Sequence, residues 1–251
     1  MKRSDWPAQD IQEVAQRSGK PLEVSVALAF LSRGWDVELG SYFADGALDE
    51  LRELDVLATR EKTSERDGNP THVRVLLSCK GFKPDEAPLT YSLSQSGLSS
   101  FARPRFLSFR NDRTGAGGLS GYDGEAASLV LKETGLTNAG PLIAFEILRR
   151  KEEGKAERQK VSFEGLGDRR IYEGLDSALK AAFFWENRER NSNSAVTSLH
   201  VPVLVFSVPF WDVCIDEGTV AAPTIANRGY HSARYPRNGE MESVTTLVWS
   251  I

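Results

Sequence analysis

Two apolar stretches of the chain each contain a residue that could take part in chemistry. The stretch "ELDVLA" (residues 53–58) carries Asp55, and "VLLSCKG" (residues 75–81) carries Lys80. A carboxylate is an oxygen ligand for hard cations such as Mg²⁺, and a lysine can stabilise negative charge that develops in a reaction. Two interpretations are open: each residue is an ordinary charge at a strand end, or the two meet in space and act together.

The segment between the two stretches predicts that they pair. "SERDGNP" (residues 64–70) has the Asp-Gly and Asn-Pro signals of a turn, and both flanking segments are rich in strand-forming residues. A hairpin centred near Asp67 and Gly68 pairs residues whose numbers sum to about 135, with a register set to within a residue or two. Asp55 and Lys80 are then expected opposite each other at one end of a two-stranded ribbon.

The second of these strands has two unlike faces. By alternation, one face holds Val73, Val75, Leu77 and Cys79, and the other holds Arg74, Leu76, Ser78 and Lys80. The first face is expected in the core. The second becomes polar toward Lys80, which is typical of a strand that enters a cleft.

A third charged residue, Glu23, lies in the helical pattern of residues 20–34. At 100° per residue it falls among Val26, Ala27 and Phe30, on the face that should be buried. A buried carboxylate is costly unless it is paired, hydrogen-bonded or bound to a metal. The alternative is a first-turn glutamate that interacts with the helix dipole and reaches solvent.

The rest of the chain mixes helical and strand patterns. Helices are expected at 10–19, 20–34, about 89–101, 124–135 and 171–188, and further strands at 35–43, 141–150, 200–208 and 243–251. The charged run 149–160 is interpreted as a solvated hairpin or helix end rather than a linker. These patterns predict a single α/β domain over residues 1–251, with a mixed central sheet flanked by helices.

Composition limits the classes of protein. With 251 residues, 26% charged and 40% hydrophobic, the chain is typical of a soluble globular protein with a substantial core. The net charge of −4 means that any nucleic-acid surface must be a local patch. Two cysteines without CxxC spacing argue against a disulfide framework or a zinc knuckle. No signal-peptide or membrane-spanning pattern is visible, so we expect a cytoplasmic protein.

The order of the helix with Glu23, "ELDVLA" and "VLLSCKG" resembles the PD-(D/E)XK nuclease superfamily, which has the restriction-endonuclease-like fold. The resemblance covers roughly residues 20–105. It implies a core of a helix, a three-strand antiparallel meander and a second helix. It also implies that Asp55 binds the metal, that Glu23 and the Cys79 carbonyl are further ligands, and that Lys80 is the catalytic lysine.

The chain departs from the family pattern at Ser78, where Glu or Asp usually precedes the lysine by two residues. The expected following helix contains no acid to replace it and offers only Gln95, while Asp85 and Glu86 lie in the preceding loop. The resemblance therefore leaves two functions open. One is a Mg²⁺- or Mn²⁺-dependent nuclease that hydrolyses phosphodiester bonds, in DNA rather than RNA, as in restriction or phage defence. The other is a catalytically degenerate domain that binds nucleic acid or another protein.

A stripe of arginines could contact the phosphates of a nucleic acid. Residues 101–113 hold Arg103, Arg105, Arg110 and Arg113, with phenylalanines between them. The alternative is a solvated face whose phenylalanines lie in the core. Segment 227–239 has a similar but weaker pattern and is interpreted as a surface loop. The three histidines have no ligand partner at helical or turn spacing and are interpreted as structural. A second copy of the chain, or a defence protein, would be a further partner.

Overall fold

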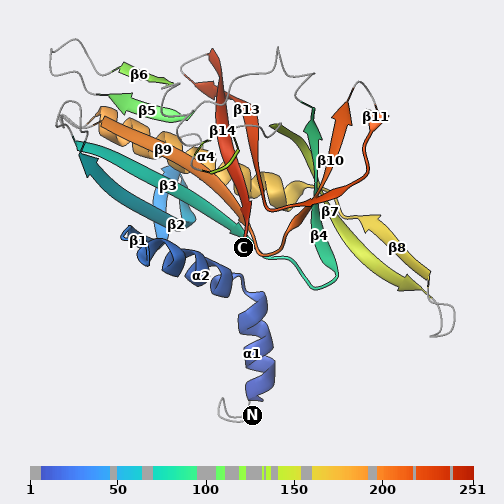
Figure 1. Ribbon diagram of the computed structural model, residues 1–251. Helices are drawn as coiled ribbons and strands as arrows, with labels where there is room; N and C mark the ends of the chain where they lie inside the picture. Colours follow the sequence, from blue (N-terminus) through green and yellow to red (C-terminus); the bar gives the residue numbers. More distant parts are fainter. Residues whose placement is uncertain are drawn as a thin grey trace.

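A computed structural model describes residues 7–45, 50–63, 70–94, 106–110, 119–122, 132, 134–136, 141–153, 160–191, 197–216, 219–237 and 240–251. Over these residues the chain forms one 14-stranded mixed sheet with helices packed against it (Figure 1). The prediction of an α/β fold with a mixed central sheet is therefore confirmed.

The described helices are α1 (Ala8–Arg17), α2 (Lys20–Leu31) and α4 (Arg169–Arg190). The strands of the first half are β1 (Asp36–Asp45), β2 (Glu50–Thr63), β3 (Pro70–Lys80), β4 (Glu86–Leu93), β5 (Leu107–Arg110), β6 (Leu119–Tyr122), β7 (Pro141–Glu153) and β8 (Lys160–Gly165). Those of the second half are β9 (Thr197–Phe206), β10 (Phe210–Asp216), β11 (Thr219–Val220), β12 (Thr224–Ala226), β13 (Arg228–Arg237) and β14 (Glu240–Ser250).

One part of the sheet is a meander that continues into parallel strands. β1, β2 and β3 pair antiparallel in that order, and β9 then adds to β3 in parallel. β14 adds to the other side of β9, also in parallel. Lys80 and Ser250 both pair with Phe206, so the last residues of β3, β9 and β14 lie side by side at one end of the sheet.

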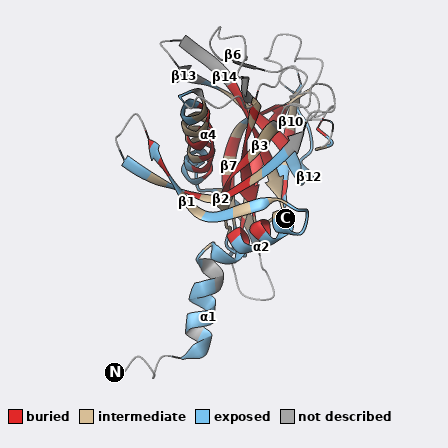
Figure 2. Cartoon of the chain, turned by 90° about the vertical axis from the view of Figure 1, so that its left-hand side faces the viewer, coloured by how far each residue is buried: buried red, intermediate tan, exposed pale blue. Residues whose placement is uncertain are grey.

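Two helices cover opposite faces of this part of the sheet. On one face, Leu22, Val26 and Ala27 of α2 pack with Val56, Ala58, Val75 and Leu77. On the other face, Leu179, Ala181 and Ala182 of α4 pack with Leu54, Leu57 and Leu76. Both helices turn buried residues toward the sheet, whereas α1 projects away from the body with an exposed surface (Figures 1 and 2). The middle parts of β2 and β3 are thus buried on both faces, which explains why residues 56–58 and 75–77 are continuously apolar.

The other part of the sheet corrects two predictions. Residues 86–93 form strand β4, not the start of a helix, because β7 and β10 pair with both of its edges. Its Thr90 and Tyr91 favour a strand once two neighbours are present. Residues 228–237 form strand β13 rather than a surface loop, and Tyr230 and His231 are buried there.

The remaining element predictions fall into two groups. The strands at 35–43, 141–150, 200–208 and 243–251 and the helices at 10–19, 20–34 and 171–188 are present with shifted ends. The charged run 149–160 belongs to an antiparallel pairing of β7 with β8, as expected for a hairpin. The helix expected at 124–135 lies almost entirely outside the described residues.

Candidate functional site

Asp55 contacts the strand that carries the lysine, but two residues before the expected partner. Val56 pairs with Leu77, so Asp55 lies across from Ser78 and not from Lys80. Its Oδ2 accepts a hydrogen bond of 2.6 Å from the Cys79 N–H and one of 3.2 Å from Ser78 Oγ. The observed register differs from the expected one by two residues, at the limit of the range allowed for it, because apolar pairs on both faces of the sheet, and not the centre of the turn, set the register.

The backbone of β2 changes its alternation at Asp55. Leu54 packs on the α4 side of the sheet and Val56 on the α2 side, although residues two apart on a regular strand share a face. The pairing with β1 also skips this position, where Gly40 has a φ of +64°. Asp55 therefore sits at an irregularity in β2, and its carboxylate reaches the backbone of β3 instead of pointing straight out of the sheet.

Glu23 is buried, as its position on the helix predicts, and its carboxylate faces the same region from α2. Gly19 (φ +80°) precedes α2, and Pro21 lies in the first turn, so the sequence fixes where this helix begins. Lys20 Nζ lies 2.8 Å from Glu23 Oε2 and 3.3 Å from Glu53 Oε1. The Glu23 carboxylate is thus neutralised by a lysine of its own helix and does not extend into solvent.

The Cys79 thiol lies among the charges of the candidate site. Burial raises its pKa above the usual value, and the carboxylates of Asp55 and Glu23 raise it further. Lys80 and Lys20 act in the opposite direction on the same thiol. These effects place both carboxylates and both lysines within electrostatic reach of one sulfur atom, which itself remains protonated.

Lys80 extends along the α4 side of the sheet. A Cβ added to Gly174 of α4 would lie 2.6 Å from Lys80 Cε and 3.3 Å from Ser78 Oγ, so these two side chains lie side by side beneath the helix. Within the described residues, the Lys80 amine makes no hydrogen bond or ion pair. The structure therefore brings Asp55, Ser78 and Cys79 into direct contact, with Lys80 beside Ser78 and Glu23 on the opposite face near Cys79.

The described carboxylates near the end of β3 are too few for a metal site made of protein ligands alone, and would suit only an ion held by one or two of them. The described residues contain no group of three or more His, Cys, Asp or Glu side chains placed to hold an ion. Asp55 Oδ1 accepts no hydrogen bond from them, so it is available as a ligand. Mg²⁺ commonly uses one or two carboxylates and completes its shell with waters and substrate phosphates. Asp55 could supply one such carboxylate, whereas the Glu23 carboxylate is paired with Lys20, and the contact of Cys79 with Asp55 runs through its N–H and not its carbonyl.

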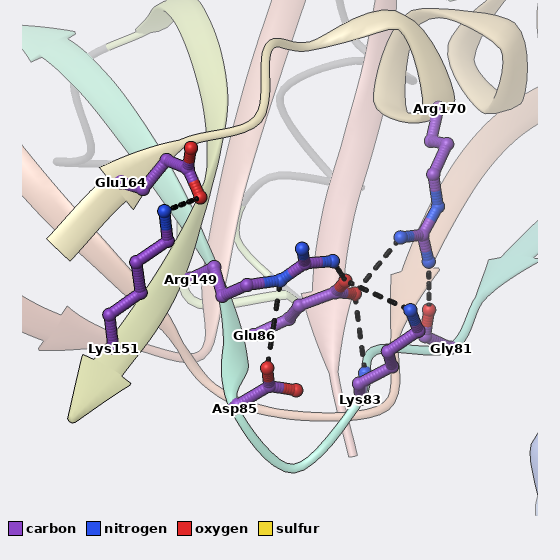
Figure 3. Close-up of polar contacts among 8 residues, drawn as sticks. All are labelled: Gly81, Lys83, Asp85, Glu86, Arg149, Lys151, Glu164 and Arg170. Atoms are coloured by element: carbon purple, nitrogen blue, oxygen red, sulfur yellow. Dashed lines mark hydrogen bonds and ion pairs between the residues drawn. The ribbon is translucent and has the colours of Figure 1, made fainter. Parts of the chain in front are cut away.

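Glu86 cannot replace the acid missing at position 78, because a cluster of cations occupies its carboxylate (Figure 3). Arg149 Nη2 donates to Glu86 Oε1 at 2.9 Å, and Arg170 Nη1 donates to Oε2 at 3.0 Å. Burial alone would raise the pKa of the Glu86 carboxyl, but these hydrogen bonds outweigh it and hold the pKa below its usual value. Sequence patterns could not find this cluster, since its members come from β4, β7 and α4.

Most of the predicted arginine stripe lies outside the described residues. Arg103, Arg105 and Arg113 lie outside the described residues, as does Gln95, and Arg110 is described only as part of β5. Arg110 pairs with Thr197 at the start of β9, whereas Lys80 pairs with Phe206 at its end. At about 3.3 Å per residue, the backbone of Arg110 is roughly 30 Å along the strand from Lys80.

A second group of charged residues lies between the other end of β3 and the end of α4. Arg74 Nη1 forms an ion pair with Glu189 Oε1, and His200 Nε2 lies 3.1 Å from Glu189 Oε2 and 3.2 Å from Ser198 Oγ. Glu189 and Ser198 both contact Nε2, so the three do not form the relay of a hydrolase triad, which needs both ring nitrogens. Ser198 and His200 are fully buried, and the interpretation of His200 as structural agrees with this position.

Comparisons of the chain with models of protein families, with characterised proteins and with solved structures found no match. None of the described helices is long and apolar enough to cross a membrane.

Proposed function

We propose that the protein is a metal-dependent nuclease with a PD-(D/E)XK-type site, which hydrolyses phosphodiester bonds in DNA. The observation that carries the proposal is the juxtaposition at the end of β3. The Asp55 carboxylate is held by the Ser78–Cys79 segment, while the Lys80 amine extends beside Ser78 without a partner among the described residues. An amine left unpaired next to an anchored carboxylate is the arrangement that charge stabilisation during hydrolysis requires.

The order of the first elements also supports the proposal. Helix α2 and the meander β1–β2–β3 follow the order that the resemblance implies. The second helix of the implied core, expected at about 89–101, is replaced over residues 86–93 by strand β4, and the helix on the opposite face, α4, follows only after strands β4–β8. DNA is preferred over RNA by the resemblance alone.

Each residue would have a separate role. Asp55 Oδ1 would hold the ion, with Glu23 as the second carboxylate once it leaves or shares its ion pair with Lys20. A bound Mg²⁺ or Mn²⁺ would neutralise the phosphate and activate a water molecule. The Lys80 amine would stabilise the charge that builds up on the phosphate oxygens in the transition state. The Cys79 N–H holds the Asp55 carboxylate in place, which fixes the ligand before the ion arrives.

Cleavage assays test the proposal. The protein is incubated with supercoiled, linear and single-stranded DNA and with RNA, over a range of Mg²⁺ and Mn²⁺ concentrations. Asp55→Ala and Lys80→Ala should each lower the cleavage rate by about 10²–10³-fold, because they remove a metal ligand and the charge that stabilises the transition state. Lys80→Ala should leave DNA binding nearly unchanged.

Lys151→Ala is the matched control, since Lys151 pairs with Glu164 on an exposed hairpin and should be dispensable. Cleavage that survives both Asp55→Ala and Lys80→Ala would exclude this site as the origin of the activity.

A second candidate function has one observation in its favour. The Glu23 carboxylate is already paired with Lys20, and Ser78 supplies no charge, so Asp55 could be too weak a ligand by itself. The domain would then bind nucleic acid or a protein without cutting. Calorimetric titration with Mn²⁺ in the presence of DNA separates the two functions: heat that disappears in Asp55→Ala supports the nuclease, and no heat in either protein supports the binding module.

A further inference from the structure

The first two turns of α4 contact the end of β3 through residues four apart on one helical stripe. Arg170 contacts the segment just beyond Lys80, and Gly174 contacts Lys80 itself. Residues at i and i+4 lie above one another on a helix, so a single face of α4 makes both contacts.

Gly174 leaves room for the Lys80 side chain. A methyl group at this position would lie 2.6 Å from Lys80 Cε and 2.7 Å from Leu204 Cδ1, closer than real side-chain contacts allow. Gly174 is in the interior of a helix, where glycine is less favourable than alanine, and its φ is not in the left-handed region. The reason for a glycine here is therefore the close approach of Lys80 and Leu204, and not the backbone conformation.

Arg170 fixes the chain where it leaves β3. Its Nη2 donates a 2.6 Å hydrogen bond to the Gly81 carbonyl, and its Nη1 donates to Glu86. The guanidinium also lies over the Phe82 ring, 5.5 Å from its centroid. Figure 3 shows Arg170 reaching from α4 toward both Gly81 and the buried Glu86, which Arg149 holds from β7. Arg170 thus links the peptide that follows Lys80 to α4 and, through Glu86, to β4.

We infer that Arg170 and Gly174 are positioning residues for Lys80, an inference that rests on the proposed function. A lysine side chain has four flexible torsions, and a free one samples many conformers. The α4 backbone at Gly174 lies against the Lys80 side chain and excludes conformers that point further toward the helix. The hydrogen bond from Arg170 to the Gly81 carbonyl fixes the backbone just after Lys80. The amine then lies beside Ser78 before substrate binds, so less ordering is needed at the moment of reaction.

Two added methyl groups provide the test. Gly174→Ala places a methyl group against Lys80 Cε, whereas Gly81→Ala places one beside the same lysine in open space with no atom within 4 Å. We expect Gly174→Ala to lower kcat at least tenfold with KM for DNA unchanged within twofold, and Gly81→Ala to leave both within twofold. If the wild type cleaves DNA, equal activity of the two variants would overturn the inference.

A further variant separates the two contacts of the new methyl group. Leu204→Val in the Gly174→Ala background removes the crowded leucine carbon but leaves the contact with Lys80. If Lys80 is displaced, kcat stays low in the double variant. Full recovery of kcat would show that the loss came through Leu204 and would count against positioning of Lys80.

A spectroscopic measurement keeps the inference distinct from the proposed function. Lysines are labelled by reductive ¹³C-methylation, and the Lys80 resonance is assigned as the one missing from Lys80→Arg. Gly174→Ala should shift this resonance and Gly81→Ala should not, whether or not the wild type cuts DNA. An inactive wild type with this pattern would contradict the nuclease alone, and an unshifted resonance in Gly174→Ala would contradict the positioning alone.

Discussion

The two ends of β3 both place charged side chains under α4, but they differ in how those charges are compensated. At the Arg74 end, Glu189 bridges the guanidinium and His200, and the group is almost closed to solvent. At the Lys80 end, the amine has no hydrogen-bond or ion-pair partner among the described residues, and one oxygen of Asp55 accepts no bond from them.

This difference shows why a charge within an apolar strand does not by itself indicate function. Arg74 and Lys80 lie on the same face of the same strand and look equivalent in the sequence. A buried pair that is mutually satisfied holds the fold together, and removing one partner leaves the other uncompensated. An unpaired amine next to an anchored carboxylate contributes little to folding and is available for a ligand. The ion pairs, and not the residue types, distinguish a charge that is compensated within the fold from one that is left without a partner among the described residues.

Removal of Glu189 should disrupt the buried group of Arg74, Glu189 and His200 and produce the largest change in stability. Glu189→Ala leaves Arg74 and His200 without their shared acceptor, so the free energy of unfolding should fall by about 3–5 kcal/mol. Urea denaturation measures the change. Glu173→Ala is the matched control on the same helix, because its ion pair with Arg169 is exposed and should contribute about 0.5 kcal/mol or less.

The Lys80 end of β3 should be dispensable for folding, because the Lys80 amine has no partner among the described residues. Lys80→Ala should change the free energy of unfolding by no more than about 1 kcal/mol. If Lys80→Ala and Glu189→Ala destabilised the protein equally, the two ends would not differ in the way described.

Because it contains His200, the buried group at the Arg74 end should also make the free energy of unfolding depend on pH. Burial and the Arg74 guanidinium lower the pKa of His200 to about 3, so the ring is neutral in the folded protein. In the unfolded chain it takes up a proton below about pH 6.5, which favours unfolding. His200 therefore contributes fully above that pH, and its contribution falls by up to about 1.4 kcal/mol per pH unit as the pH decreases toward 3.

Urea denaturation at pH 7.5, 6.5 and 5.5 measures this slope. The pKa of the buried His231 is lowered too, so it adds to the slope in the same direction. His200→Gln keeps a donor for Glu189 but cannot titrate, and it should flatten the slope. His72→Gln, on the partly exposed β2–β3 hairpin, is the control. An unchanged slope in His200→Gln would contradict a neutral buried His200.

The smallest expected effect concerns the metal requirement of the proposed site at the Lys80 end of β3. Ser78→Glu places a second carboxylate beside Asp55, and the Mg²⁺ concentration needed for half-maximal cleavage should fall several-fold because the ion gains a charged ligand. Metal titrations of the cleavage rate measure it. Ser25→Glu, on the exposed face of α2, adds the same charge away from the site and should have no effect. An unchanged metal requirement in Ser78→Glu would argue against this location for the ion.

Local patterns predicted the elements around the site but not their exact alignment. The burial of Glu23 follows from the helical period, and the pairing of β2 with β3 follows from two strand patterns around a turn. The exact register of β2 with β3 could not be predicted, because pairs such as Val56 with Leu77 depend on helices packed on both faces of the sheet. Strand β4 was not predicted because its pairing partners, β7 and β10, come much later in the chain.

The contacts made by α4 were beyond sequence reasoning for a related reason. Gly174 looks like an unfavourable residue within a helix, and only its distance from Lys80 explains it. Arg170 looks like one of several charges at a helix start, and its bond to the Gly81 carbonyl depends on how the helix lies across the sheet. Both contacts link segments that are far apart in the chain.

The parallel pairing of β3 with β9 has a consequence for how the protein folds. Thr71 pairs with Thr197, and strands β4–β8 and helix α4 must be made before that ladder can close. Closing so long a loop is slow, whereas the hairpin of β2 and β3 can form from neighbouring residues. During synthesis the hairpin with Asp55 and Ser78 would therefore form early, while the apolar edge of β3 stays open until β9 arrives. An open apolar strand edge is a template for association with other chains, so slow closure makes the newly made protein prone to aggregate before its sheet is complete.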